Sequence, residues 1–147
     1  MIRVTRRYEF SASHRLHAEG LTDEQNRRLY GKCNNPFGHG HNYVLEVSVR
    51  GPVDARSGRA IDPVALDRLV GERVLQALDH KNLNEQIEAF DHIVPTTENL
   101  GLLIHDRLKH AWPGAFPGLW PQLEKVRIAE TARNIFEVNE SHQSKAS

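Results

Sequence analysis

Residues 39–50, HGHNYVLEVSVR, alternate between two kinds of side chain. One set is apolar and continues the parity of His39 and His41, with Tyr43, Leu45, Val47 and Val49. The other set is mainly polar and includes Asn42, Glu46, Ser48 and Arg50. A period of two residues is typical of a β-strand with one buried face. This stretch therefore predicts a strand whose two histidines point to the core side.

A second alternating stretch opens the chain. Its even positions carry the apolar residues Ile2, Val4, Tyr8, Phe10 and Ala12. His14 and Leu16 continue the same parity, so we expect a strand that faces the same core. A long connection over residues 17–38, rich in charge, asparagine and glycine, separates the two strands. A loop of that length inside a compact domain is usually functional or disordered.

The rest of the chain predicts two helices followed by two strands. Asp62-Pro63 is a typical helix start, and an apolar stripe continues to about Leu78. A second helix is expected from Thr96-Thr97 to Pro113-Gly114, and further strands near residues 126–128 and 135–138. A short strand over residues 59–61 is expected to pair back. The predicted fold is α+β, an antiparallel four-stranded sheet with both helices on one face, in the order ββααββ.

Composition limits the classes of protein to consider. The chain has 147 residues, which predicts one domain over residues 1–138 and a polar, disordered tail over 139–147. Nineteen basic and nineteen acidic residues give zero net charge, which disfavours a nucleic-acid or membrane-surface binder. The single cysteine excludes an internal disulfide, and no segment reads as a targeting signal or a membrane span. We therefore expect a cytoplasmic protein.

Three of the nine histidines are predicted to meet. In a hairpin of the two strands, His14 lies beside His39 and His41, and all three share the core-facing side. A lone histidine on an apolar face is more often a hydrogen-bonded core residue, but three in register indicate a metal. Three protein ligands leave the fourth position of a tetrahedral zinc ion open, as in catalytic sites. Five further histidines are expected at the surface: His17, His92, His105, His110 and His142.

The single thiol, Cys33, lies in the long connection. The sequence leaves three roles open for it: an inert buried thiol, a fourth ligand that closes a structural zinc site, or a base or nucleophile activated by the cation.

Two further sites carry acidic residues with alternative roles. Asp79-His80 follows the first helix and is either a turn with a helix-end charge or a pair that tunes a thiol. Glu130 ends an inward-facing strand, where a carboxylate needs partners unless it turns to water.

Six motifs, taken in order, resemble the 6-pyruvoyl-tetrahydropterin synthase family. They are FSASHRL at residues 10–16, GKCNNP at 31–36, GHGHNY at 38–43, LDHKNL at 78–83, TTEN at 96–99 and Glu130-Thr131. Each motif alone is weak, but the ordered set is specific and covers nearly the whole chain.

The resemblance implies a fold, a reaction and roles for the motif residues. The fold is the tunnelling fold, which assembles into a β-barrel and typically forms homohexamers, two stacked trimers. The reaction converts 7,8-dihydroneopterin triphosphate to 6-pyruvoyl-tetrahydropterin with elimination of triphosphate, in tetrahydrobiopterin-type pterin synthesis. His14, His39 and His41 match the zinc ligands, and Cys33 matches the general base. Asp79 and His80 match the pair that activates the thiol, Glu130 the acid that anchors the pterin, and Thr97 and Glu98 further pterin contacts.

Two other functions are compatible with these residues. The 6-carboxy-tetrahydropterin synthases of queuosine biosynthesis use the same substrate, metal and thiol, but commonly have three residues between the cysteine and the first histidine of the metal pair. This chain has five, Asn34 to Gly38, which favours the pyruvoyl branch. The other is a non-catalytic module whose structural zinc is held by Cys33 and the three histidines.

Overall fold

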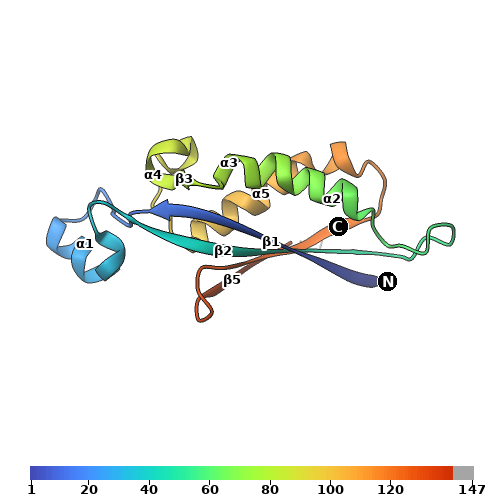
Figure 1. The fold of residues 1–147 in the computed structure, drawn as a ribbon, viewed down its shortest axis with the longest axis horizontal. Coiled ribbons are helices and arrows are strands. Elements are labelled where there is room, and N and C mark those ends of the chain that lie inside the picture. Colours follow the sequence, from blue (N-terminus) through green and yellow to red (C-terminus); the bar gives the residue numbers. More distant parts are fainter. Residues whose placement is uncertain (141–147) are drawn as a thin grey trace, which may run out of the picture.

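A computed structural model of the protein describes residues 1–140. One layer is a twisted five-stranded sheet in the order β3-β1-β2-β4-β5, and the longer helices cover one face of it (Figure 1). Its strands are β1 (Ile2–His14), β2 (His39–Gly51), β3 (Lys81–Asn82), β4 (Gln122–Ala129) and β5 (Ile135–Asn139). The fold class is α+β, as predicted.

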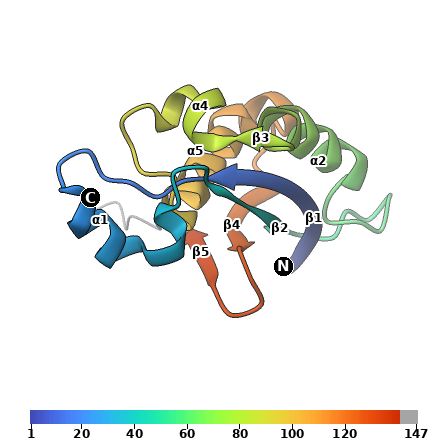
Figure 2. The same cartoon turned by 60° about the vertical axis from the view of Figure 1, so that its left-hand side comes forward.

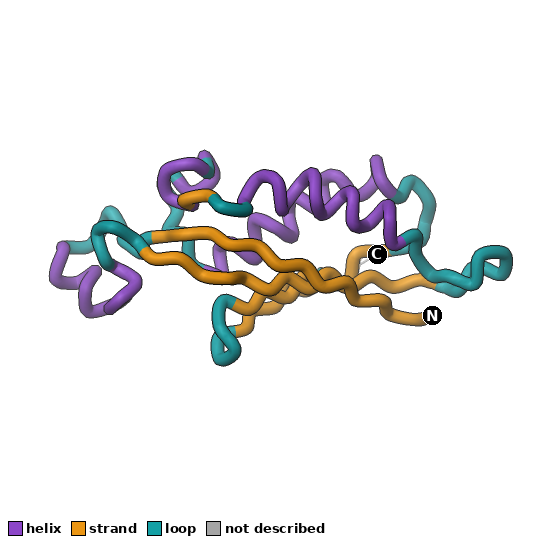
Figure 3. Tube along the Cα trace, in the orientation of Figure 1, coloured by secondary structure: helices purple, strands orange, loops and turns teal. Residues whose placement is uncertain are grey.

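The hairpin of β1 and β2 confirms the parity argument. The two strands pair antiparallel from Ile2 opposite Gly51 to His14 opposite His39. The side chains that face the helices are buried, among them Phe10, Ala12, Tyr43, Leu45, Val47 and Val49. The tube in Figure 3 shows these two strands running side by side below the helices. The core therefore holds the hairpin rigidly up to the end that carries the histidines.

Two long helical stretches form the second layer. The first consists of α2 (Pro63–Val70), a π-helical turn (Gly71–Leu75) and α3 (Gln76–Leu78), and the Asp62 side chain caps its start. The second, α5 (Thr97–Ala115), is capped by Thr96, whose hydroxyl accepts from the backbone of Asn99. The predicted end at Pro113-Gly114 was wrong by a residue or two. The backbone N–H of Phe116 donates to the carbonyl of Trp112, and both rings pack together at the core edge.

The simple order ββααββ is incomplete. The long connection contains α1 (Asp23–Tyr30) and a 3-10 turn (Gly31–Asn34) at one end of the molecule (Figure 2). Helix α1 is polar and starts with a reciprocal cap between Thr22 and Gln25, so it has no apolar stripe for a periodicity search to detect.

The sheet has five strands rather than four because β3 pairs parallel with β1. Two residues are too few to show a period of two in the sequence. Short helices α4 (Leu83–Gln86) and η3 (Glu88–Phe90) follow β3. The expected strand over residues 59–61 does not form. Instead, a turn closes when the N–H of Asp54 donates to the carbonyl of Arg59.

The predicted tail begins inside the described chain. Asn139 ends β5, and the N–H of Glu140 donates to the carbonyl of Glu124 on the neighbouring strand. Residues 141–147, the rest of the predicted tail, lie outside the described residues. Within residues 1–140, no helix is long and apolar enough to cross a membrane.

Candidate metal centre and active site

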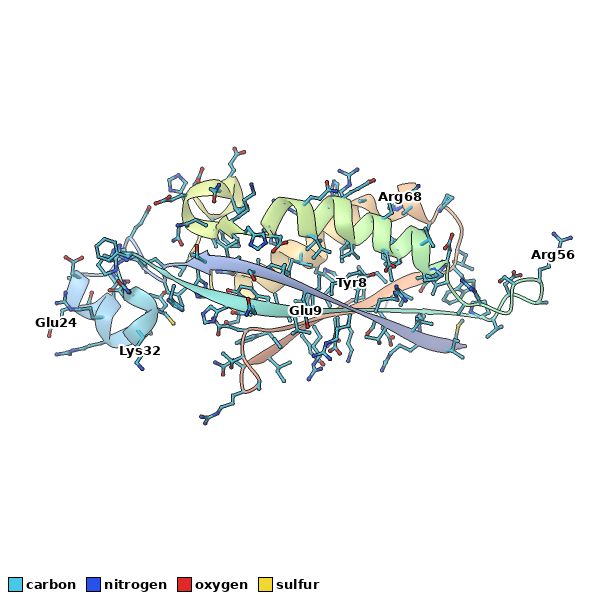
Figure 4. The ribbon with its side chains drawn as sticks, viewed as in Figure 1. Tyr8, Glu9, Glu24, Lys32, Arg56 and Arg68 are labelled. Carbon is cyan, nitrogen blue, oxygen red and sulfur yellow. The ribbon has the colours of Figure 1, made fainter. Side chains whose placement is uncertain are left out.

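The three predicted histidines converge at one end of the β1–β2 hairpin. His14 is the last residue of β1 and pairs with His39, the first residue of β2, while His41 pairs with Ala12. The ring centroids lie 4.9 Å apart for His14 and His39, 5.0 Å for His14 and His41, and 4.5 Å for His39 and His41. The cluster lies towards the end of the molecule that carries α1. Figure 4 labels Glu24 and Lys32 at this end and Arg56 at the opposite one.

His14 is held in one tautomer. Its Nδ1 lies 2.8 Å from the carbonyl oxygen of Pro95, in the segment that leads into α5. A carbonyl oxygen only accepts, so Nδ1 donates and carries the hydrogen. Nε2 of the neutral ring then carries a free lone pair, which is directed into the cluster. Metal-binding histidines typically donate their other ring N–H in this way.

Several nitrogens of the cluster are buried without a hydrogen-bond partner within residues 1–140: His14 Nε2, His39 Nδ1 and His41 Nε2. Burial lowers the pKa of His14 and of His39, and the nearby His41 lowers both pKa values further. These shifts favour the neutral imidazole that a metal ion requires. Buried, unpaired ring nitrogens gathered around one point fit a bound cation, and imidazole suits zinc.

Two further donors border the histidines. The thiol of Cys33 forms one possible ligand group with His14 and His39, and a carboxylate oxygen of Glu130 forms another with His14 and His41. In each group the ligand atoms lie within 4.8 Å of one another. Burial raises the pKa of the Cys33 thiol, and the nearby carboxylate of Glu130 raises it further. The structure thus brings five of the predicted site residues to one place.

The loop that carries Cys33 is tied to the segment after β1. The N–H of Leu16 donates to the carbonyl of Cys33 at 2.7 Å, and the side-chain amide of Asn34 donates to the carbonyl of Leu16 at 2.8 Å. Asn34 is itself buried and also contacts His17 Nδ1 at 3.1 Å. These bonds fix the thiol relative to His14, two residues before Leu16.

Asp79 and His80 lie at the edge of the sheet. Asp79 Oδ1 accepts from the N–H of Ser11 at 2.9 Å, and the N–H of His80 donates to the carbonyl of Ser11 at 2.6 Å. His80 Nε2 lies 3.7 Å from Asp79 Oδ2, and its side chain is 81% exposed. Within the described chain, no hydrogen bond or ion pair joins either residue to Cys33. His80 and His41 do line the same surface pocket.

Thr97 and Glu98, the two predicted site residues at the start of α5, differ in burial. Thr97 is buried, and its hydroxyl has no hydrogen-bond partner in the described part of the chain. Glu98 is exposed. No described hydrogen bond or ion pair brings either residue to the histidine cluster.

One histidine prediction was wrong. His105 was expected on the solvent side of its helix, but its side chain is only 12% exposed and its Nε2 lies 3.4 Å from Glu140 Oε1. Glu140 directly follows β5 and brings its carboxylate to this part of α5, a contact that the local helix pattern does not show. His142 lies outside the described residues.

Sequence reasoning missed the residues that support the site. Pro95 contributes only its carbonyl, which no side-chain pattern reveals. Asn84 exchanges two hydrogen bonds with the backbone of Arg15, at 2.7 and 2.8 Å. The position of Asn34 beside Cys33 in GKCNNP was the available signal, because a buried asparagine next to a functional loop residue often bonds backbone groups.

Comparison with known proteins agrees with this geometry. Residues 3–141 match the family model described as 6-pyruvoyl tetrahydropterin synthase. The chain belongs to this family. The 6-pyruvoyl tetrahydrobiopterin synthase of Poecilia reticulata is 45% identical over 90% of this chain and 86% of its own length, and that of Homo sapiens is 44% identical over 90% and 87%. The structure of the Caenorhabditis elegans 6-pyruvoyl tetrahydropterin synthase is similar, with a TM-score of 0.84, 41% identity and coverage of 95% of this chain and 96% of that one.

Proposed function

We propose that the protein is a 6-pyruvoyl-tetrahydropterin synthase, a carbon–oxygen lyase. It converts 7,8-dihydroneopterin triphosphate to 6-pyruvoyl-tetrahydropterin, and the triphosphate leaves with the electron pair of its carbon–oxygen bond. The observation that carries the proposal is the convergence of His14, His39 and His41, with unpaired ring nitrogens, beside a thiol and a carboxylate. Membership of the family supports it.

The metal in this proposal is zinc, held by His14, His39 and His41. When bound, zinc acts as a Lewis acid that makes the substrate's side-chain hydroxyl groups and adjacent C–H bonds more acidic. The hydrogen bond from His14 Nδ1 to the carbonyl of Pro95 orients the ring of His14. The strand pairing of His14 with His39 places His39, the second proposed ligand, beside it. The proposed donors therefore lie on two paired strands rather than on a loop.

Cys33 is the proposed general base that moves protons between the side-chain carbons and oxygens. Its sulfur lies within 4.8 Å of a ring nitrogen of His14 and of His39, so a substrate bound at the histidines is within reach of the thiol. The oxidation of the side chain balances the reduction of the pterin ring, so no redox cofactor is required. Glu130 anchors the ring by accepting from adjacent N–H donors, and Thr97 and Glu98 make further pterin contacts.

Asp79 and His80 are proposed to activate Cys33 from a neighbouring subunit. Their position at the sheet edge and the exposure of His80 support action across an interface rather than within one chain. The proposed assembly is a homohexamer of two stacked trimers, in which the sheets join into the β-barrel of the tunnelling fold. No nucleic-acid or membrane partner is proposed, and the cytoplasmic location stays a prediction.

A Cys33→Ala variant separates this proposal from a structural zinc module. The lyase reading predicts that the variant keeps its zinc and its fold and loses turnover, because the thiol acts on substrate. A closed structural site predicts that the variant loses zinc and stability together. Zinc content, thermal unfolding and triphosphate release, measured on the same preparation, decide between them, with Ser13→Ala as a control near the site. A variant that keeps both zinc and full turnover would contradict both readings.

A further inference from the structure

His17 lies between two buried asparagines rather than on the open surface. The side-chain nitrogen of Asn34 is 3.1 Å from His17 Nδ1, and that of Asn26 is 3.5 Å from His17 Nε2. Asn26 is fully buried, Asn34 is 6% exposed, and His17 is half-buried. The contact with Asn34 therefore joins His17 to the turn that carries Cys33.

The side-chain amide of Asn34 decides what His17 can do. Its nitrogen has two N–H donors, one of which donates to the carbonyl of Leu16 at 2.8 Å and leaves the other for His17 Nδ1. An amide nitrogen only donates, so Nδ1 accepts and the hydrogen of the neutral ring lies on Nε2. The opposite tautomer would set two donors against each other. Without an acceptor at this place, a buried N–H of Asn34 would stay unpaired, which is unfavourable.

The main chain on either side of Asn34 is bonded to the same segment. The N–H of Leu16 donates to the carbonyl of Cys33 at 2.7 Å, and Arg15 Nε donates to the carbonyl of Asn34 at 3.2 Å. The amide of Asn34 adds the bond to the carbonyl of Leu16. The position of the thiol thus depends on the orientation of the Asn34 amide.

The backbone next to His17 is held from the other side. Asn26 Oδ1 accepts from the N–H of Ala18 at 2.7 Å, and Asn26 Nδ2 donates to the carbonyl of Ala18 at 3.0 Å. Asn26 lies in α1, so this helix fixes the residue that follows His17. The imidazole therefore projects from a fixed main chain towards Asn34.

We propose that His17 is a positioning residue for Cys33. It acts through Asn34, because its Nδ1 holds the amide in the orientation that ties the thiol-bearing turn to the segment after β1. The proposal rests on the proposed function for the role of Cys33 as the base, but the position of the thiol can be measured without substrate. What this place requires is an acceptor at the position of Nδ1.

Alkylation by iodoacetamide reports how firmly the thiol is held, because Cys33 is the single cysteine of the chain. In the zinc-loaded protein, His17→Ala is expected to raise the alkylation rate by about 2- to 10-fold, the change in a local opening equilibrium when one hydrogen bond is lost. His17→Asn puts an amide oxygen near the position of Nδ1 and should restore the wild-type rate. His110→Ala, at an exposed histidine of α5, should leave it unchanged.

Two further variants separate the hydrogen bond from the packing of the ring. His17→Phe fills the space of the imidazole without an acceptor and should alkylate as fast as His17→Ala; a wild-type rate would overturn the proposal. Asn34→Ala should alkylate at least as fast, and adding His17→Ala to it should raise the rate no further, because both changes break one link. Additive effects of the two changes, a wild-type rate in His17→Ala, or a fast rate in His17→Asn would each overturn it.

Turnover gives an independent readout. Displacement of a base impairs the chemical step more than binding, so His17→Ala should lower kcat by roughly 10-fold with KM nearly unchanged, and His17→Asn should recover kcat. A raised KM at wild-type kcat would contradict the positioning role. If the wild-type protein shows no lyase activity, the proposed function fails, and the alkylation rates still decide whether His17 positions the thiol.

Discussion

Gly38 lies directly against the backbone of His14. A β-carbon at Gly38 would come within 3.0 Å of the carbonyl oxygen of His14, and the glycine has a φ of +71°. Both features are local requirements for the chain to enter β2 beside His14, one of the proposed metal ligands. They explain why the residue before His39 is a glycine rather than any small residue.

Gly38→Ala is therefore expected to disturb both stability and the proposed metal centre. The left-handed backbone alone costs about 1–2 kcal/mol for a residue with a β-carbon, and the collision with His14 adds to it. Gly58→Ala is the matched control, because Gly58 also has a φ of +71° but has nothing within 4 Å of its added β-carbon. Urea unfolding and Zn²⁺ affinity check the pair. Equal losses in both variants would show that the contact with His14 does not matter.

The backbone conformation of His80 is expected to lower the stability of the fold while serving function. It is the only described residue other than glycine with a positive φ, at 58°. Strained backbone at such a position often accompanies a functional role. His80→Gly should keep or raise the free energy of unfolding, by up to about 1 kcal/mol, while turnover is lost. His92→Gly, at an exposed histidine without positive φ, should lower stability slightly and leave turnover unchanged. A destabilised His80→Gly would contradict the strain argument.

The face of α5 that packs on the sheet should dominate its contribution to stability. Ile104 is fully buried, whereas Leu102, two residues earlier, is 56% exposed. Ile104→Ala is expected to lower the free energy of unfolding by about 2–5 kcal/mol through lost burial and a cavity. Leu102→Ala should change it by less than about 0.5 kcal/mol. Chemical denaturation measures both, and similar losses would mean that the two faces are assigned wrongly.

Asp67 should make stability depend on pH in the acid range. Hydrogen bonds and charge from Arg6, with a further hydrogen bond from the Tyr8 hydroxyl, hold the pKa of Asp67 below its usual range. A lowered pKa stabilises the fold above the unfolded value, about 3.9, and this contribution is lost as pH falls through the folded value. The pair is partly exposed, so we expect about 1 kcal/mol or less at neutral pH.

Asp67→Asn measures this contribution. The variant should be less stable than wild type at pH 7, and the difference should shrink when urea unfolding is repeated near pH 3. Asp91→Asn, at an exposed carboxylate, should show little difference at either pH. A difference between Asp67→Asn and wild type that stays constant down to pH 3 would show that the charge of Asp67 is not what stabilises the fold.

The strands that carry the histidine cluster could be predicted because both obey one period. In β1 and β2 the same parity that buries Phe10 and Tyr43 also directs His14 and His41 inward, so one rule located the core and the histidine cluster together. Arg6 breaks the apolar pattern on that face. It was not recognised as an inward residue because its partner, Asp67, lies on a helix remote in sequence.

Features that depend on contacts between distant segments escaped prediction. The carbonyl of Pro95 that orients His14 and the approach of Glu140 to His105 both need the folded topology. The close approach of Glu130 to His41 is of the same kind. Parity suggested that Glu130 faces inward, but only the pairing of β4 beside β2 brings its carboxylate to the histidine cluster.

Incubating the zinc-loaded protein with 7,8-dihydroneopterin triphosphate tests the proposed lyase activity. We expect release of inorganic triphosphate and a product with the mass of 6-pyruvoyl-tetrahydropterin. A product with the mass of 6-carboxy-tetrahydropterin, formed with acetaldehyde, would assign the chain to the carboxy branch instead. If the triphosphate stays on the substrate and no new pterin forms, the lyase assignment is wrong.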